Sequence, residues 1–269
     1  MSYALLVCDL DGTLIDHSLL LDPELVGAFR RAAERGLLIS LATGRMPAAA
    51  DRYRDELRIR APIIYYNGAL LRDPLSGKDL LSITLPRGIL RQAYEVFAHA
   101  PVHPLFYRDD TLYCLEQSLP VRSYCDEEGL RAEVIDEPAD FLALGAFVKS
   151  LLIGHPQALP LVREELEGVV GEGARLLRTR STYLEVVPAS ASKGSALRRL
   201  TEHLGVPLER TVAVGDQEND LEMIQAAGLG VAMPHAPEFV RAAADRVAPE
   251  PEAGGLLALL RELMPEHFA

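Results

Sequence analysis

The stretch Val7-Cys8-Asp9-Leu10-Asp11-Gly12-Thr13-Leu14 joins an apolar segment to two acids near the start of the chain. Residues 3–8 form an unbroken apolar run, which is typical of a fully buried strand inside a parallel sheet. In open α/β sheets ligands bind beyond the C-terminal ends of the strands, where Asp9 and Asp11 stand. Two carboxylates so close together repel each other unless a cation lies near them. The stretch therefore indicates a metal ion and an anionic substrate.

Two other interpretations of this stretch need to be weighed. A strand followed by Asp-x-Asp-Gly can be only a polar turn, because Asp and Gly are favoured turn residues. An EF-hand calcium loop also begins with Asp-x-Asp, but here the glycine comes two positions early and Leu20 stands where that loop needs Glu. The calcium loop is excluded, and the choice between a turn and a site depends on the other motifs of the chain.

The composition excludes several classes of partner. The 269 residues are 49% hydrophobic and 25% charged, which is enough for one large core or two modest domains. The formal net charge of −12 argues against nucleic acid and against an anionic membrane surface as partners. The odd number of cysteines, three, favours a reducing compartment. We expect neither a signal peptide nor a membrane span, and therefore a cytoplasmic protein; its oligomeric state is left open.

Strand and helix patterns alternate in the first third of the chain. Asp22 and Pro23 are favoured at the start of a helix, and Gly36 is favoured just after its end. Apolar runs at 37–42 and 62–66 predict the second and third strands, with a helix between them. The alternation resumes at residue 192, with buried strands near 211–214 and 229–233. This order predicts an α/β fold with a doubly wound, Rossmann-like parallel sheet.

The middle of the chain has a different rhythm. We expect a hairpin over residues 70–84, and after it a mixture of short strands and helices. This α+β pattern predicts an inserted domain at residues 85–188, while 1–84 and 189–269 together form the catalytic core.

Four groups of polar residues stand at predicted strand ends or helix starts: Asp9 with Asp11, Thr43 with Gly44, Lys193, and Asp216 with Asn219 and Asp220. Each group has a purely structural explanation when taken alone, such as helix capping by Thr43. Lys193 is harder to explain, because the helix dipole disfavours a cation in the first turn and Gly194 is a poor helix former. A shared site that binds an anion accounts for all four groups at once.

These residue types suit phosphoryl transfer. Mg²⁺ prefers hard oxygen ligands, which carboxylates and a carbonyl supply. A phosphoryl group needs N–H groups, a hydroxyl and a cation around its oxygens, and a carboxylate can attack phosphorus to give an aspartyl-phosphate. A Walker loop is absent, since the order at residues 193–195 is Lys-Gly-Ser.

In these motifs the chain resembles the haloacid-dehalogenase-like superfamily of phosphatases. Four segments resemble the family's motifs in order: Asp9-Leu10-Asp11-Gly12-Thr13, Ala42-Thr43-Gly44-Arg45, Lys193-Gly194 and Gly215-Asp216-Gln217-Glu218-Asn219-Asp220. The insertion resembles a cap of the C2B type, by position and size more than by motif. Asn67-Gly68-Ala69 and Asn219-Asp220-Leu221-Glu222-Met223 resemble the Cof-type branch.

The resemblance implies a role for each motif residue. Asp9 would be the nucleophile and a Mg²⁺ ligand, and Asp11 would be the general acid and base, with its backbone carbonyl on the metal. Asp216 would be the third protein ligand, and Asp220 would lie in a second shell behind the metal ligands. Contacts to phosphate or substrate are implied for Thr43, Gly44, Lys193, Asn219 and Asn67.

The acid at position 11 favours phosphate-ester hydrolysis or phosphomutation within this superfamily. We therefore expect a Mg²⁺-dependent phosphatase of a small phosphorylated metabolite, either a sugar phosphate or a nucleotide- or cofactor-like monoester. A sugar-phosphate phosphomutase and a non-catalytic phosphometabolite-binding protein are the alternatives. Arg178 and Arg180 are weak candidates for contacts to an anionic substrate. The segment Pro234-His235-Ala236 stands where relatives often have Gly-Asn-Ala. His235 could replace a polar contact near the metal loop, but we favour a surface or capping position for it.

Overall fold

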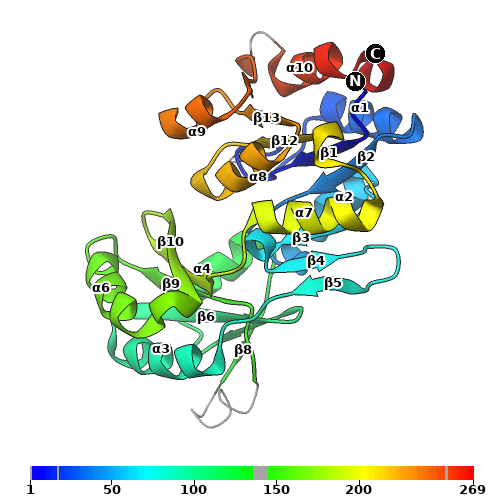
Figure 1. The fold of residues 1–269 in the computed structure, drawn as a ribbon. Coiled ribbons are helices and arrows are strands. Elements are labelled where there is room, and N and C mark those ends of the chain that lie inside the picture. Colours follow the sequence, from blue (N-terminus) through cyan, green and yellow to red (C-terminus); the bar gives the residue numbers. More distant parts are fainter. Residues whose placement is uncertain (1, 17, 136–144, 252–253) are drawn as a thin grey trace. The chain divides into compact units, whose positions relative to one another are not determined.

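The computed structural model describes residues 2–16, 18–135, 145–251 and 254–269 (Figure 1). The chain forms two compact units. The core unit comprises Met1–Arg45, Ala50–Leu81 and Ser192–Ala269, and the inserted unit comprises Ser82–Ala191 with Met46–Ala49. The insertion predicted at residues 85–188 falls inside the second of these units. None of the described helices is both long and apolar enough to cross a membrane.

A parallel sheet lies at the centre of the core unit. Its strands are β1 (Leu5–Cys8), β2 (Leu38–Leu41), β12 (Thr211–Gly215), β13 (Leu229–Ala232) and β14 (Arg246–Val247), in the order β14-β13-β12-β1-β2. All four residues of β1 are fully buried, as the apolar run predicted. The chain leaves β1 toward β2 on one side, while β12, β13 and β14 lie on the other. This change of direction creates a switch point beside β1, where open α/β sheets bind ligands.

Helices cover both faces of this sheet, which confirms the predicted doubly wound architecture (Figure 1). The helices are α1 (Pro23–Glu34), α2 (Pro47–Leu57), α7 (Lys193–Leu204), α8 (Leu221–Ala226), α9 (Glu238–Ala243), α10 (Gly255–Leu263) and α11 (Pro265–Phe268). Leu5 and Val7 of β1 share an apolar cluster with Leu197 and Leu200 of α7. Burial of these side chains helps to hold α7 against the sheet.

The third predicted strand departs from the parallel sheet. β3 (Ile63–Tyr65) pairs antiparallel with β4 (Leu70–Arg72), and β5 (Asp79–Ser82) completes a separate three-stranded sheet. Among the described residues, one isolated parallel bridge, Ala42 to Ile64, connects this sheet to the first one. The hairpin expected over residues 70–84 is formed by β4 and β5. The chain therefore turns back through Asn67 and Gly68, which both have positive φ, instead of continuing into another crossover helix.

The inserted unit has an α+β organisation around a six-stranded sheet of order β10-β11-β9-β6-β7-β8. Its strands are β6 (Val102–Arg108), β7 (Thr111–Cys114), β8 (Ala132–Val134), β9 (Lys149–Gly154), β10 (Ala174–Arg180) and β11 (Tyr183–Pro188). Its helices are α3 (Arg87–His99), α4 (Leu119–Glu128) and α6 (Leu159–Val170). Neighbouring strands are antiparallel except β7 and β8. Phe97, Phe106 and Phe147 are buried in the core of this unit.

The short 3₁₀ segments are Tyr66–Gly68, Gly171–Gly173, Leu208–Arg210 and Glu218–Asp220.

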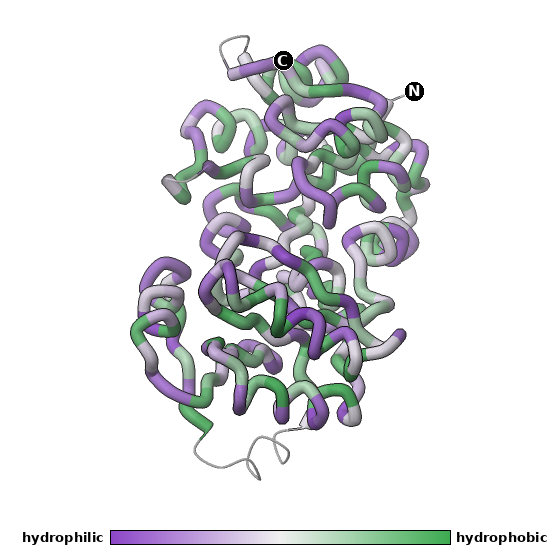
Figure 2. The backbone as a smooth tube through the Cα atoms, turned by 90° about the vertical axis from the view of Figure 1, so that its left-hand side faces the viewer, coloured by the Kyte–Doolittle hydropathy of each residue, from purple (hydrophilic) through white to green (hydrophobic). Residues whose placement is uncertain are grey.

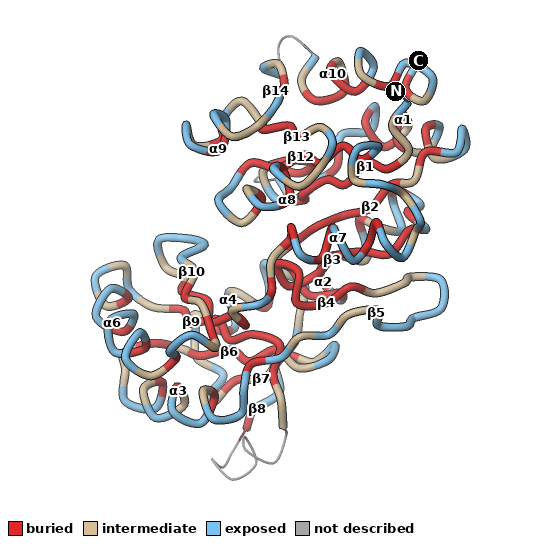
Figure 3. The backbone as a smooth tube through the Cα atoms, in the orientation of Figure 1, coloured by how far each residue is buried: buried red, intermediate tan, exposed pale blue. Residues whose placement is uncertain are grey.

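Hydrophobic and hydrophilic residues alternate along the backbone of both units (Figure 2). Most strand residues of the two larger sheets are buried, whereas the helices expose one side (Figure 3). Each unit therefore has a hydrophobic core of its own.

Two glycines allow the start of α7 to approach its neighbours. A Cβ atom added at Gly68 would lie 2.1 Å from the Ser192 carbonyl oxygen, and one at Gly194 would lie 2.6 Å from Cβ of Glu222. The Ser192 side chain caps the helix by accepting the Ser195 N–H at 3.0 Å. Side chains at either glycine would push α7 outward, and Lys193, its first residue, would move with it.

We predict that Gly194→Ala lowers the free energy of unfolding by about 1–3 kcal/mol, because the new methyl group meets backbone and Cβ atoms of Glu222 that cannot easily move. Gly27→Ala in α1 is the matched control, since its nearest new contact is the flexible end of Arg31. The control should gain about 0.5–1 kcal/mol from helix propensity. Urea titration of both variants measures these values. Equal effects of the two substitutions would contradict the close approach at Gly194.

Candidate active site

The predicted site residues come from adjacent elements of the core unit. Asp9 follows β1, Thr43 follows β2 and Asp216 follows β12, and β1 pairs with both of the other strands. The three residues therefore lie at the same C-terminal edge of the parallel sheet. Lys193 joins them from the first position of α7.

A buried ammonium group holds two of the acids. Lys193 is fully buried, and its Nζ lies 2.5 Å from Asp9 Oδ1 and 2.6 Å from Asp220 Oδ1. Burial alone would lower the pKa of Lys193, but the adjacent Asp220 and Asp9 carboxylates outweigh it and raise the pKa above its usual value. Lys193 is therefore a fixed positive charge. The sequence indicated an anion near the start of this helix, and the carboxylates of Asp9 and Asp220 are anions that lie there.

Asp9 has one oxygen without a partner. The residue is 5% exposed, and its Oδ2 atom is buried with no hydrogen bond, while Oδ1 accepts from Lys193. Burial raises the pKa of Asp9; Lys193 lowers it, and the Asp220 and Asp216 charges raise it further. One oxygen from each of Asp9, Asp216 and Asp220 lies within 4.8 Å of the others. Three crowded carboxylates with a single ammonium group among them suit a divalent cation.

Asp220 uses both of its oxygens within the protein. Oδ2 accepts the backbone N–H groups of Asp216 and Gln217, each at 3.0 Å, and Oδ1 accepts from Lys193. A Cβ atom at Gly215 would lie 2.5 Å from Cβ of Asp220, so the absence of a side chain there permits this packing. Asp220 therefore orients the Asp216 loop and Lys193 at once.

Asp216 is 2% exposed and lies among several polar groups. Gln217 Nε2 donates to its Oδ2 at 2.8 Å, and Thr13 Oγ1 donates to its Oδ1 at 3.3 Å. Burial raises the pKa of the Asp216 carboxyl. His235 Nε2 lies 3.4 Å from Oδ2. The His235 side chain is 53% exposed, which fits the favoured surface position, and it also faces Asp216, which fits the alternative of a polar contact near this loop.

Asp11 has a partner that the sequence did not reveal. Arg45 Nε donates to Asp11 Oδ2 at 2.8 Å, and Arg45 Nη2 donates to Oδ1 at 2.6 Å, which makes a two-pronged ion pair. The Arg45 side chain is 7% exposed and that of Asp11 is 45% exposed. Arg45 is part of the second motif, but that motif assigned it no role. A predicted pairing of β1 with β2 could have revealed this ion pair, because Asp11 and Arg45 lie just beyond those two strands.

The remaining predicted contacts form a second cluster in the core unit. Asn219 Nδ2 donates to Asn67 Oδ1 at 2.9 Å, and a Cβ atom at Gly44 would lie 3.0 Å from the same oxygen. Thr43 is fully buried, and its Oγ1 accepts the Arg45 N–H at 3.0 Å. The fold thus gathers Gly44, Asn67 and Asn219 from three distant parts of the sequence.

Arg178 and Arg180 belong to the inserted unit and both have partners there. Arg178 donates to the Ser181 carbonyl at 2.8 Å, and Arg180 pairs with Glu127 at 2.7 Å and lies over the Tyr183 ring. Their suggested role toward substrate remains a prediction.

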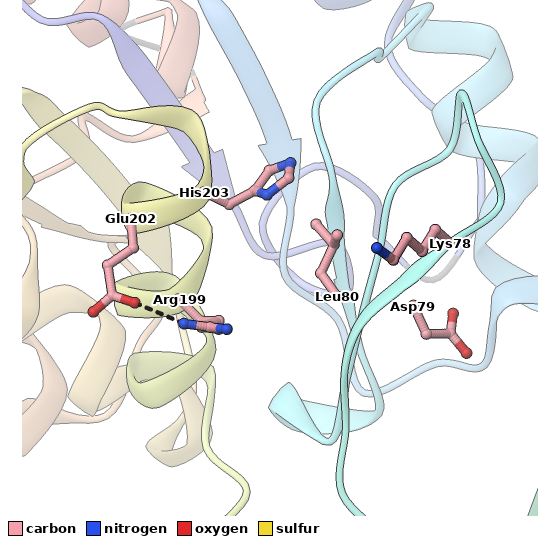
Figure 4. A pocket seen from close by; sticks show the side chains of 6 residues that line it. All are labelled: Lys78, Asp79, Leu80, Arg199, Glu202 and His203. Carbon is pink, nitrogen blue, oxygen red and sulfur yellow. Dashed lines mark hydrogen bonds and ion pairs between the residues drawn. The ribbon is translucent and has the colours of Figure 1, made fainter.

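A cavity of about 370 Å³ lies elsewhere in the core unit, between the β4–β5 hairpin and α7 (Figure 4). Its lining residues are Lys78, Asp79, Leu80, Arg199, Glu202 and His203. It contains none of the predicted site residues, so it does not mark the active site.

Comparison with known proteins places this arrangement in a family. The family profile of the haloacid dehalogenase-like hydrolases matches residues 6–260. YxeH of Bacillus subtilis (strain 168) is 31% identical over 250 residues, which cover 90% of this chain and 91% of that protein. The HMP-PP phosphatase of Escherichia coli O6:H1 is 30% identical over 239 residues, covering 87% and 85%.

Solved structures agree with the sequence comparison. A haloacid dehalogenase-like hydrolase from Bacteroides thetaiotaomicron superposes with a TM-score of 0.89 at 27% identity, covering 97% of this chain and all of that one. Since the family profile spans nearly the whole sequence and relatives of similar length are named as phosphatases, the protein belongs to the haloacid dehalogenase-like hydrolases, in the Cof-type branch of phosphoric monoester hydrolases.

Proposed function

We propose that the protein is a Mg²⁺-dependent phosphatase that hydrolyses a small phosphorylated metabolite, a sugar phosphate or a nucleotide- or cofactor-like monoester, through an aspartyl-phosphate on Asp9. The observation that carries the proposal is the unpaired, buried Oδ2 atom of Asp9 beside an ammonium group that holds Oδ1. A nucleophile of this kind needs a free lone pair and a fixed orientation. Within the proposal, residues 1–84 and 189–269 are the catalytic core, and 85–188 are the cap.

Asp9, Asp216 and the backbone carbonyl of Asp11 would hold the cation. Asp220 lies close to them, but its two oxygens already accept three hydrogen bonds, which favours a place for it behind the ligands. Mg²⁺ matches this set of hard oxygen donors. When bound, it would polarise a phosphoryl oxygen and offset negative charge.

Each side chain then has a distinct task. The Asp9 Oδ2 lone pair forms a bond to phosphorus while the bond from phosphorus to the leaving oxygen breaks. Asp11, in its protonated form, gives a proton to that oxygen and later takes one from the water that attacks the aspartyl-phosphate. Lys193 and the cluster of Thr43, Gly44, Asn67 and Asn219 supply donors around the transferred group.

The Arg45 pair bears on the timing of the Asp11 step. While Arg45 donates to both carboxylate oxygens, the Asp11 carboxylate is held by the protein and not by a substrate. Because the Asp11 side chain is 45% exposed, it has room to leave Arg45 when a substrate arrives. We infer that Asp11 is paired with Arg45 between turnovers and leaves this pair when a substrate binds. No observation favours a phosphomutase over hydrolysis.

Metal removal tests the first part of the proposal. Dialysis against EDTA should abolish hydrolysis of a small aryl phosphate, and added Mg²⁺ should restore it, because Asp9 and Asp216 repel each other without a cation. Ca²⁺ should support the reaction poorly, since it takes a looser coordination with more ligands. Release of inorganic phosphate is the measurement. Full activity of the metal-free protein would refute Mg²⁺ dependence.

The substitution Asp11→Asn separates proton transfer from metal binding. It should lower kcat/KM by about 10²–10⁴ for alkyl phosphates, whose poor leaving groups need a proton. The loss should be smaller for an aryl phosphate whose leaving group departs unaided, because kcat/KM reports the steps up to departure of the leaving group and not the later hydrolysis of the intermediate. Mg²⁺ affinity, measured by titration, should change little because the proposed contact is through the backbone. An equal loss on all substrates with a large loss of Mg²⁺ affinity would make Asp11 a structural metal ligand.

A further inference from the structure

The loop after β13 presents an imidazole to the carboxylate cluster. His235 Nε2 lies 3.4 Å from Asp216 Oδ2. The backbone around it is fixed, because Arg241 Nη1 donates to the carbonyls of Pro234 and Ala236 at 2.9 Å each, and the Met233 N–H donates to the Gly215 carbonyl at 3.0 Å. The loop therefore keeps the ring of His235 beside Asp216.

The His235 ring lies beside Asp216 but makes no hydrogen bond to it. The 3.4 Å separation exceeds the range of about 2.7–3.2 Å for an N–H···O hydrogen bond. Within the described part of the chain, no hydrogen bond engages either ring nitrogen of His235. Asp216 does not need His235 for orientation, since Gln217 and Thr13 already donate to its two oxygens. An imidazole that makes no hydrogen bond, next to a carboxylate proposed to bind a cation, has a nitrogen lone pair available for that cation.

The distance suits two atoms that share one cation. Ligands about 2.1 Å from a metal are about 3.0 Å apart along an octahedral edge and about 3.4 Å apart along a tetrahedral edge. Asp216 Oδ2 accepts one hydrogen bond, from Gln217, so a lone pair remains for a cation. A cation on this oxygen would lie within reach of the imidazole after a small rotation of a side chain that is 53% exposed.

We propose that His235 is a nitrogen ligand that lets this site bind first-row transition ions such as Co²⁺, Ni²⁺ and Zn²⁺, and thereby sets its metal selectivity. Imidazole adds affinity for these ions, whereas Mg²⁺ takes oxygen donors and keeps its waters. The inference rests on the proposed function only in placing a cation on Asp216. His235 adds a donor for one class of metals and leaves Mg²⁺ binding to the carboxylates.

Metal binding by the full-length, metal-free protein tests this proposal, with calorimetric titrations of Co²⁺ and of Mg²⁺. His235→Ala and His235→Asn should each weaken Co²⁺ binding by about tenfold or more and change Mg²⁺ binding less than about threefold. His203→Ala in α7 is the matched control, because His203 is also exposed but lines the cavity away from the carboxylates. The control should leave both affinities unchanged.

A spectroscopic measurement identifies the ligand directly. The Co²⁺-loaded protein should give a paramagnetically shifted imidazole N–H resonance in its proton NMR spectrum, and this resonance should disappear in His235→Ala and remain in His203→Ala. Equal weakening of Co²⁺ and Mg²⁺ by the His235 variants, or no such resonance in the unmodified protein, would overturn the proposal. Failure of Mg²⁺ to bind or to support hydrolysis in the unmodified protein would instead refute the proposed function.

Discussion

The buried ammonium group of Lys193 connects the parts of the core unit that carry the chemistry. Its Nζ contacts Asp9 beyond β1 and Asp220 ahead of α8. Taking these charges out of water is costly, and their mutual attraction offsets that cost only while all three stay in contact. Removing the ammonium would leave uncompensated carboxylates inside the protein, a change that typically costs about 3–5 kcal/mol. The network thus explains why the ends of β1 and β12 and the start of α7 come together in one arrangement.

Much of the surrounding structure serves to bring Lys193 to that position. The first turn of α7 comes so close to Gly68 and to the Glu222 backbone that a side chain on Gly68 or Gly194 would not fit. The Asp216 loop approaches Asp220 in the same way at Gly215. Glycine in the third and fourth motifs therefore has a packing reason that is separate from any contact with phosphate. The same network leaves Asp9 with one bonded and one unbonded oxygen, which is the asymmetry that a nucleophile needs.

Local sequence patterns predicted the elements better than they predicted the contacts between them. The apolar run before Asp9 was enough to predict a buried central strand, and the alternation around it was enough to predict the parallel sheet. The departure of β3 into an antiparallel sheet was missed, because a short apolar run reads the same in either setting. The ion pair between Asp11 and Arg45 was missed because it depends on which strands are neighbours. The approach of His235 to Asp216 depends on the path of the loop after β13. The sequence suggested a polar contact of His235 near the metal loop only as the less favoured alternative, from a departure from the family pattern.

The central claim, a covalent phosphate on Asp9, can be tested directly by chemical trapping. In the Asp11→Asn variant, hydrolysis of the intermediate should be slowed, so that the phosphorylated enzyme accumulates. The reaction with an aryl phosphate is quenched in acid, the protein is reduced with borohydride, and the peptide that contains residue 9 is sequenced by mass spectrometry. The account predicts homoserine at position 9, formed by reduction of the aspartyl-phosphate, and none in a protein that also carries Asp9→Asn. A covalent phosphate on any other residue, or turnover that persists in the Asp9→Asn protein, would contradict it.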